Sequence, residues 1–306
     1  MTQRRLPKRS PLRKDDLAIS FAMTTSIDVD AYFRRIGYRG SRAATLETLQ
    51  AIHLGHTTAI AYENLNPLLG RPVRLDSISL QKKLIHDGRG GYCFEHNLLF
   101  SHVLRALGFS VTGLAARVLW ERPEDIITGR GHMLIRVEIE NRFYLVDAGF
   151  GGSTPTGPLR FEPELEQSTP HEPFRLIEFG QGFKVQCKIA REWKTLYRFD
   201  LQEAFPPDYE IANYYLSTHP DSFFLNCLLV ARAATNCRYV LYNDQFGVHH
   251  LNGTTERRVL KDPKEMREML ETNFLLNLSE IPDLDIALNR ILAISAPPNT
   301  DRESER

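Results

Sequence analysis

The sequence predicts an α+β protein in which a helical segment is followed by a run of short strands and then by a mixture of both. Up to about residue 108 the apolar residues recur at helical spacing. From residue 110 onward, β-branched and aromatic residues come in short runs that polar or glycine turns separate. After Pro206-Pro207 the two patterns alternate. A chain of 306 residues is too long for one minimal core, so we expect two or three packed units.

Residues 1–23 differ in composition from the rest of the chain. They carry six basic residues before the first acid, Asp15, together with two prolines. A transit peptide and a basic arm for an acidic partner are the two functional interpretations. Because the segment has no apolar stretch that would anchor or export the chain, we favour a disordered leader upstream of an alternative start at Met23.

Residues 24–110 are expected to form a helical bundle. Gly108 is placed to end the last helix, and Asp76-Ser77 offers an N-cap for the third. Apolar spacing places the four helices at residues 27–36, 45–59, 76–86 and 94–107.

Residues 111–205 are expected to form an antiparallel barrel or a curled sheet, because several short strands at close spacing are typical of these folds. Five prolines between residues 155 and 173 indicate a long surface excursion within this unit. The strands are expected at residues 111–120, 133–139, 143–150, 174–179, 183–189 and 193–199.

Residues 206–298 are expected to form a mixed unit, and the polar residues 299–306 are expected to fray. One helix has a clear start, with Asp262 as cap and Pro263 at the first helical position. Helices are expected at residues 208–216, 263–274 and 284–294, and strands near 223–230, 238–242 and 255–260.

Charge and composition bound the function. Lysine plus arginine equals aspartate plus glutamate, 38 each, which argues against nucleic acid or an anionic membrane as the main partner. No apolar run approaches the length of a membrane span. The cysteines lie far apart without C-x-x-C spacing, so we expect reduced cytosolic thiols rather than a disulfide framework or a zinc site. They are Cys93, Cys187, Cys227 and Cys237.

The strongest chemical signal is the stretch from Arg89 to Asn97, in which two glycines precede Cys93. The glycines release the backbone from steric limits just before a helix begins, so we expect Cys93 in the first helical turn. Unpaired N–H groups and the helix dipole favour an anion there, which draws a thiol toward its reactive thiolate form. Taken alone, a cysteine is more often a core residue than a nucleophile.

A thiol nucleophile needs a base, and the base needs a partner that fixes its tautomer. His132 opens one predicted strand and Asp147 closes the next, with Glu140-Asn141 as the turn between them. In a hairpin around that turn the two side chains come within about a residue or two of facing each other. The sequence thus predicts an imidazole beside a carboxylate, but it does not by itself bring Cys93 to them.

Five segments resemble the arylamine N-acetyltransferase family, in the family's order and over roughly residues 24–280. Tyr62 stands where the family usually has phenylalanine, which bears on acceptor preference rather than on the chemistry. The segments are 61–65 (AYENL), 89–95 (RGGYCFE), 131–132 (GH), 146–151 (VDAGFG) and 218–224 (THPDSFF).

The resemblance implies a cysteine-protease-like triad, with Cys93 as nucleophile, His132 as base and later acid, and Asp147 as orienting carboxylate. It implies an α/β lid in the last third and a ping-pong transfer of acetyl from acetyl-CoA to an aromatic amine or hydrazine. Some members also acetylate the oxygen of N-hydroxyarylamines. Acetyl-CoA is then a co-substrate, with no permanently bound cofactor and no metal.

The resemblance also implies roles for residues around the triad. It implies contacts with coenzyme A for Thr128, Gly129, Gly151 and Phe224, an acceptor pocket that includes Tyr62 and Phe150, and a structural ion pair between Glu63 and Arg89.

Two other patterns carry less weight. Gly149–Gly152 faintly resembles a dinucleotide loop, but residues 153–158 cannot begin the helix that such a loop requires. Four histidines match no common metal-ligand set, so surface or capping roles are expected for His96, His102, His249 and His250.

Three alternative functions remain open at this point. One is an acyltransferase or amide synthase on the same scaffold that uses another acyl donor. The second is a thiol hydrolase, and the third is a catalytically silent binding protein. We expect a cytoplasmic monomer or weak homo-oligomer.

Overall fold

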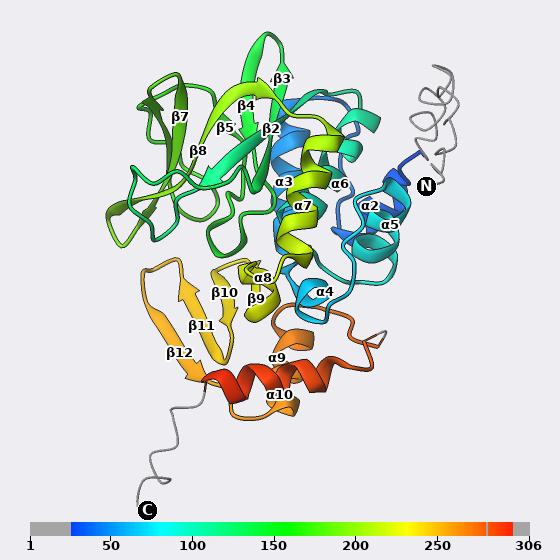
Figure 1. Cartoon of the computed structure of the whole chain (residues 1–306). Helices are drawn as coiled ribbons and strands as arrows, with labels where there is room; N and C mark the ends of the chain where they lie inside the picture. The colour runs from blue at the N-terminus through cyan, green and yellow to red at the C-terminus, as the bar shows by residue number, and fades with distance from the viewer. Residues whose placement is uncertain (1–25, 280, 296–306) are drawn as a thin grey trace, which may run out of the picture.

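The computed structural model describes residues 26–279 and 281–295, and it contains two antiparallel sheets (Figure 1). The larger sheet lies in the upper part of the view and the smaller one in the lower part, with helices beside both. The expected leader (1–23) and the expected polar tail (299–306) lie outside the described residues. None of the helices within the described ranges is long and apolar enough to cross a membrane.

The first helices begin where the sequence offers caps. The Asp28 carboxylate accepts a hydrogen bond from the Ala31 N–H, and the Asp76 carboxylate accepts one from the Ser79 N–H. The third predicted helix is present, but it changes halfway into a π-helix. The elements of this part are α2 (Val29–Arg35), α3 (Leu46–Ala59), β1 (Tyr62–Glu63), α4 (Leu65–Leu68), α5 (Ser77–Leu80), the π-helix η2 (Gln81–His86) and α6 (Cys93–Ala106).

Seven strands form a nearly closed antiparallel barrel in the order β5-β4-β3-β2-β8-β7-β6. The gap between the two edge strands is bridged where Gln167 and Phe174 exchange backbone hydrogen bonds of 2.8 and 2.9 Å. The strands are β2 (Ser110–Val118), β3 (His132–Ile139), β4 (Arg142–Val146), β5 (Leu159–Arg160), β6 (Phe174–Phe179), β7 (Gly182–Ile189) and β8 (Glu192–Glu203).

The proline-rich segment 155–173 is only in part the surface excursion that the sequence predicts: Glu162, Glu164 and Glu166 are exposed, but other residues are not. Thr156 and Leu159 are buried, and Gln167 binds the backbone of Arg160 through both ends of its side-chain amide. The segment therefore closes the barrel. The prolines mark its bends, but they do not reveal its burial.

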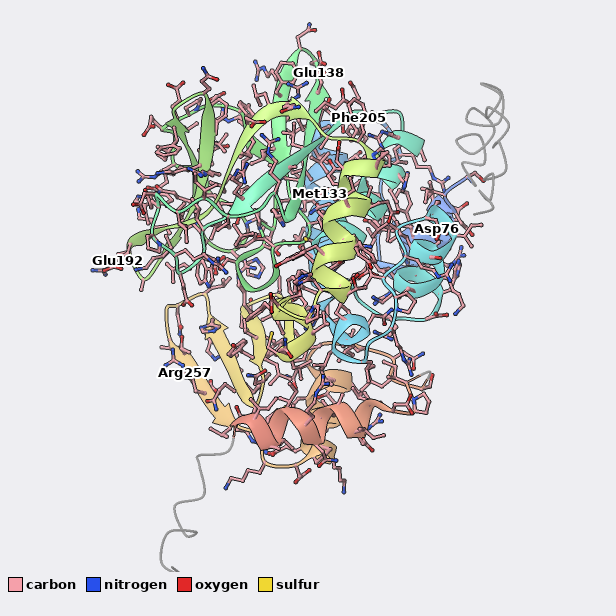
Figure 2. All side chains as sticks on the ribbon, viewed as in Figure 1. Asp76, Met133, Glu138, Glu192, Phe205 and Arg257 are labelled. Carbon is pink, nitrogen blue, oxygen red and sulfur yellow. The ribbon has the colours of Figure 1, made fainter. Side chains whose placement is uncertain are left out.

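The hairpin of β3 and β4 has the predicted turn. Glu140 and Asn141 both adopt left-handed φ angles, 50° and 60°, which suit a tight two-residue hairpin. Met133 and Glu138, which are labelled in Figure 2, are the second and the second-last residues of β3. The strand predicted at 143–150 is too long, because β4 ends at Val146 and the chain then leaves the sheet.

The smaller sheet has the order β1-β9-β10-β11-β12, so its first strand comes from the helical part of the chain. The strand predicted at 223–230 is wrong in its first half, because Ser222 caps a short helix there. Neither β1 nor β11 is predicted by the sequence analysis. The last elements are α7 (Pro206–Thr218), α8 (Phe223–Asn226), β9 (Leu229–Ala233), β10 (Cys237–Tyr242), β11 (Gln245–His250), β12 (Thr255–Val259), α9 (Pro263–Thr272) and α10 (Leu284–Ser295).

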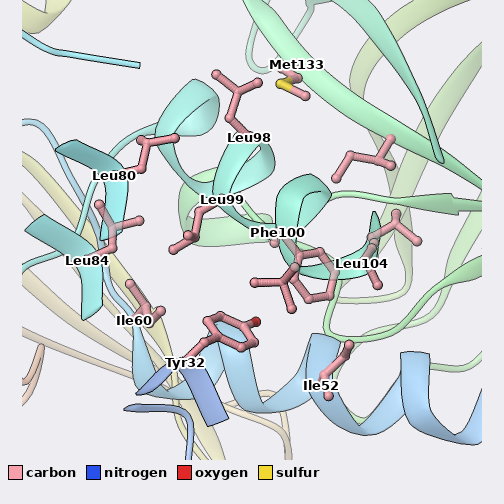
Figure 3. Close-up of a cluster of buried hydrophobic side chains, with 14 of the residues drawn as sticks. Tyr32, Ile52, Ile60, Leu80, Leu84, Leu98, Leu99, Phe100, Leu104 and Met133 are labelled. Carbon is pink, nitrogen blue, oxygen red and sulfur yellow. The ribbon is translucent and has the colours of Figure 1, made fainter. Parts of the chain in front are cut away.

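Three buried apolar clusters hold these parts together. One joins the helices to β3 and β4, and Figure 3 shows Tyr32, Ile52, Phe100 and Met133 in it. A second joins the region around α4 to the last third of the chain, and the third fills the barrel. We propose that residues 24–110, 111–205 and 206–298 are three units whose cores cross their borders.

The Gly-Gly loop, defined here as residues 89–92, passes between β1 and the start of α6. Gly91 forms a bridge with Tyr62 of β1. A Cβ atom at Gly90 would lie 2.0 Å from the Ala61 carbonyl oxygen, well inside contact distance. Only glycine therefore fits at position 90 without moving the backbone.

A buried ion pair lies beneath this loop. Arg89 donates from Nε and Nη2 to Glu63 Oε1, at 3.0 and 2.6 Å. The Leu65 N–H donates to the other carboxylate oxygen at 2.7 Å. Burial alone would raise the pKa of Glu63, but Arg89, Lys83 and this N–H favour the carboxylate and lower it from 4.5 to about 2. The ion pair implied by the family resemblance is thus present.

We expect Gly90→Ala to reduce the free energy of unfolding by about 3 kcal/mol, because the new methyl group overlaps the carbonyl group of Ala61, just before β1. Urea titration measures this loss. Gly129→Ala is the matched control, since a Cβ there meets no atom within 4 Å, and it should change stability by less than about 0.5 kcal/mol. Equal losses in the two variants would contradict the close approach at Gly90.

Acid should destabilise the protein through Glu63. A depressed pKa in the folded state stabilises the protein above pH 4.5, and this contribution is lost as the pH falls toward 2. We expect the wild type to lose about 3 kcal/mol more than Glu63→Gln across that window, measured by urea titration at each pH. Glu162→Gln changes an exposed carboxylate, so its free energy of unfolding should depend on pH as that of the wild type does. If Glu63→Gln and wild type lose the same stability with falling pH, the low pKa assigned to Glu63 is wrong.

Candidate active site

Cys93 is the first residue of α6, as the sequence predicts. The Glu95 carboxylate accepts the Tyr92 N–H at 3.0 Å, which fixes the entry of the chain into the helix. The residue is 4% exposed, and its thiol points at the chain before β3, with Sγ 3.6 Å from the Gly131 carbonyl oxygen. Two segments that are far apart in sequence therefore meet at the sulfur.

His132 and Asp147 form the imidazole–carboxylate pair that the hairpin predicts. His132 Nε2 lies 2.7 Å from Asp147 Oδ2, and both side chains are buried. The Cys93 side chain hydrogen-bonds the same imidazole. Because Nε2 faces the carboxylate, Nδ1 is the ring nitrogen that remains for the thiol. The structure thus brings all three predicted triad residues together.

The pair shifts the protonation of both partners. Burial alone would lower the pKa of His132, but the charge and hydrogen bond of Asp147, together with Cys93, raise it well above its ordinary value. Burial alone would raise the pKa of Asp147, but His132, Asn97 and the Gly149 N–H lower it. The favoured state at neutral pH is an imidazolium held by a carboxylate.

Asn97 is a functional candidate that the sequence analysis did not identify. Its Nδ2 donates to Asp147 Oδ1 at 3.0 Å and to the Met133 carbonyl at 2.8 Å. Its Oδ1 accepts the Ala148 N–H at 2.9 Å. The sequence contains a sign of this role, because Asn97 lies four residues after Cys93 and therefore lies on the same face of the helix.

Aromatic rings cover the imidazole. The centroid of the Tyr197 ring lies 4.9 Å from that of His132, and the Phe150 ring meets the imidazole edge-on at 5.2 Å. Burial, and then the Asp147 charge, raise the pKa of Tyr197, so its phenol stays neutral. These rings keep water away from the pair. Tyr197 comes from β8 and has no signal in sequence that links it to the site.

A chain of buried histidines lies behind α6. Tyr32 Oη is 2.9 Å from His56 Nδ1, and His56 Nε2 is 2.8 Å from His96 Nδ1. Burial lowers the pKa of His56 well below its usual range and that of His96 to about 4, so both rings are neutral. The predicted surface or capping role is therefore wrong for His96, whose position on the inner face of α6 buries it.

The described residues contain no group of three or more histidine, cysteine or acidic side chains that would hold a metal ion. Cys187, Cys227 and Cys237 are free and buried among packed side chains. Burial raises the pKa values of Cys187 and Cys227 to about 12, so these thiols are poor nucleophiles.

Three of the predicted substrate residues lie close to the triad. Phe150 packs on His132, as described above. The Tyr62 ring stacks parallel to that of His96 with centroids 6.3 Å apart, and a Cβ atom at Gly151 would meet this tyrosine ring at 3.7 Å. Tyr62 and Gly151 also line one small hollow.

The other three predicted residues lie further out. Phe224 meets the Tyr92 ring edge-on at 5.5 Å, so it borders the Gly-Gly loop. Thr128 and Gly129 belong to the loop between β2 and β3, where the Thr128 hydroxyl donates to the Val118 carbonyl at 3.1 Å. The structure records no contact of Thr128 or Gly129 with the triad within the residues it describes.

Known proteins resemble this chain over most of its length. A family model described as N-acetyltransferase matches residues 45–283. The arylamine N-acetyltransferase of Mycobacterium tuberculosis (strain ATCC 25618 / H37Rv) is 40% identical over 275 residues, which cover 88% of this chain and 97% of that protein. A Salmonella typhimurium protein named arylamine N-acetyltransferase / N-hydroxyarylamine O-acetyltransferase is 35% identical over 252 residues, covering 82% of this chain and 89% of that protein.

The solved structure of the Mycobacterium marinum arylamine N-acetyltransferase in complex with CoA is similar throughout. It matches with a TM-score of 0.84 at 37% identity, and the match covers 87% of this chain and 99% of that one. The predicted α+β class is confirmed. On the family match and on relatives of this identity and coverage, the chain belongs to the arylamine N-acetyltransferase family.

Proposed function

We propose that this protein transfers the acetyl group of acetyl-CoA to the nitrogen of arylamines or arylhydrazines through an acetyl-cysteine at Cys93. The meeting of Cys93, His132 and Asp147 carries the proposal. A thiol at a helix start, a cationic imidazole and an orienting carboxylate are the groups that covalent acyl transfer requires. Family membership supports the same reaction.

In the first half-reaction the Cys93 thiolate attacks the thioester carbonyl of acetyl-CoA. The C–S bond to coenzyme A breaks, and His132 gives its proton to the departing thiolate. Backbone N–H groups at the start of α6 have no intrahelical acceptor, so the Cys93 N–H is a donor for the oxyanion. One thioester replaces another, so the exchange is close to balanced in free energy.

In the second half-reaction the amine nitrogen attacks the acetyl-cysteine. His132, now neutral, takes a proton from the nitrogen as the N–C bond forms, and the Cys93 thiolate leaves. Asp147 holds the imidazole in one orientation through both halves, and Asn97 positions Asp147. The buried surroundings of the pair favour aminolysis over hydrolysis, because they keep bulk water from the imidazole.

The substrates are proposed from the relatives and from the position of each side chain. The printed name of the Salmonella typhimurium relative supports transfer to the oxygen of N-hydroxyarylamines as well. We propose that Tyr62 and Phe150 line the acceptor pocket. For coenzyme A we propose contacts with Thr128, Gly129, Gly151 and Phe224.

We propose that the protein works in the cytoplasm as a monomer or weak homo-oligomer. Four free cysteines support a reducing compartment. The small molecules named above are the partners we propose, without nucleic acid or membrane.

Cys93→Ala should abolish acetylation while leaving the fold intact, because it removes a single sulfur atom, whose hydrogen bonds go to the Gly131 carbonyl and the His132 imidazole. Intact-protein mass spectrometry after mixing with acetyl-CoA, without amine, should find one acetyl group on wild type and none on the variant. Cys237→Ala is the control and should still be acetylated. An acetyl group on Cys93→Ala, or none on wild type, would refute the nucleophile.

Asp147→Asn should lower kcat/KM by about 10³–10⁴-fold, because the amide no longer fixes the imidazole or stabilises its cation. The pKa of His132 should fall, since burial remains and the carboxylate charge is lost, so the alkaline limb of the pH–rate profile should move to lower pH.

The exposed pair His219 and Asp221 supplies the control for this experiment. Asp221→Asn removes an aspartate near a histidine at the surface, and it should leave both rate and pH profile unchanged. A loss below tenfold with an unmoved pH profile in Asp147→Asn would mean that the carboxylate is only structural.

A further inference from the structure

Lys83 lies beside the start of α6 in an unusual setting. It belongs to the π-helix η2, a rare form that is frequent at functional sites. Its side chain is 14% exposed, and its ammonium nitrogen lies 2.7 Å from Glu95 Oε1 and 3.7 Å from Glu63 Oε1. Lysine is seldom buried to this degree unless it is paired, and here it joins carboxylates from α6 and β1.

The two carboxylates do not depend on Lys83 equally. Glu63 also accepts two hydrogen bonds from the Arg89 guanidinium, and its pKa is about 2. Glu95 forms no other ion pair among the described residues. Burial raises the pKa of Glu95, although Lys83 and the Tyr92 N–H oppose the shift. Removal of the ammonium group would therefore neutralise Glu95 and leave Glu63 ionised.

Glu95 in turn fixes the loop that leads to the nucleophile. Its Oε2 atom accepts the Tyr92 N–H at 3.0 Å, and a Cβ atom at Gly91 would lie only 2.8 Å from the same oxygen. The Gly-Gly loop therefore packs directly on this carboxylate. An ionised carboxylate is also the stronger acceptor, because charge-assisted hydrogen bonds are shorter and stronger than neutral ones. The charge of Glu95 thus holds the end of the loop in place.

The next residue along the chain is Cys93, whose N–H is the proposed donor to the oxyanion. This N–H belongs to the first turn of α6, where N–H groups have no acceptor within the helix. The peptide unit that joins Tyr92 to Cys93 is planar, so the hydrogen bond that holds Tyr92 also limits how the Cys93 N–H can turn. An oxyanion donor must point at a position that is occupied only in the transition state, so a small rotation costs rate.

We propose that Lys83 is a positioning residue for acetyl transfer: through Glu95 it aims the Cys93 N–H at the oxyanion. The proposal rests on the proposed function, because an oxyanion forms only if Cys93 attacks an acyl group. Within the described ranges no contact joins Lys83 to a triad residue, so its effect passes through the Glu95 carboxylate.

Lys83→Met removes the ammonium group and keeps an apolar stem. Two reactions of Cys93 separate the consequences. Acetylation by p-nitrophenyl acetate without amine, followed as a burst of p-nitrophenolate, passes through an oxyanion. Alkylation by iodoacetamide displaces iodide from a saturated carbon and does not. We expect the acetylation rate to fall about thirtyfold, while the alkylation rate stays within about threefold of that of the wild type.

Two further lysine variants accompany this test. Lys83→Arg keeps a cation between the two carboxylates and should restore acetylation to within about fivefold of the wild type. Lys82→Met is the matched control, because it makes the same change one residue earlier. The Lys82 side chain is 69% exposed and pairs with Asp87, so this variant should match the wild type in both reactions.

Glu95→Gln tests the route, and it decides the question if Lys83→Met does not fold. The amide keeps the shape of the side chain but is a neutral acceptor for the Tyr92 N–H. Acetylation should again fall about thirtyfold, with alkylation little changed. Adding Lys83→Met to Glu95→Gln should cost less than about threefold more, because the lysine acts through the carboxylate.

The proposal is overturned if Lys83→Met or Glu95→Gln is acetylated at the wild-type rate, or if alkylation falls in parallel with acetylation. It is also overturned if the two losses multiply in the double variant. A wild type that gives no burst of p-nitrophenolate would instead contradict the proposed chemistry at Cys93, and with it any oxyanion for Lys83 to serve.

Discussion

The active site depends on one constraint: a helix that carries the sulfur must be held against strands that carry the imidazole and the carboxylate. The Asn97 side chain holds the helix against these strands, since it binds the Asp147 carboxylate, the Met133 carbonyl and the Ala148 N–H. A shift of α6 by a fraction of a turn would break all three contacts at once. Because the contacts are buried, each unpaired group would also lose its solvation.

The charge distribution of the interior follows from this arrangement. In the imidazole–carboxylate pair beside α6, the histidine is cationic despite its burial, because the Asp147 charge compensates for the lost solvation. His53, His56 and His96 lie close by without such a partner, and burial lowers their pKa values. The Asp147 charge also raises the pKa of His53, but burial outweighs it there, so His132 is the ring that the carboxylate holds as a cation.

Most helices and the central hairpin could be predicted because local rules decide them. Caps such as Asp76 and Asp262 mark helix starts, and the Glu140-Asn141 turn fixes the register that puts His132 near Asp147. The position of Cys93 relative to these two could not be predicted from local rules, and only the family resemblance implied it. For the same reason, the roles of Asn97 and Tyr197 could not be predicted, because they arise from contacts between segments that are distant in sequence.

The errors have the same physical origin. The barrel is closed by Gln167 and its side-chain bonds, which leave no periodic pattern in the sequence. The apolar residues from Phe223 led to the prediction of a strand at 223–226. The Ser222 cap starts a helix there instead. The Asn64 side chain binds the carbonyls of Phe224 and Cys227, which bends this segment away from the sheet.

The origin of β1 has a consequence for how the chain acquires its structure. This strand belongs to the first third of the molecule, yet it completes a sheet whose other strands come from the last third, and Asn64 beside it bonds to a carbonyl 163 residues away. Contacts of such long sequence separation form late, because a large loop must close before they gain anything. During synthesis the edge of β1 that pairs with β9 therefore has no partner strand until β9 has left the ribosome. Catalytic competence is acquired only when the chain is almost complete.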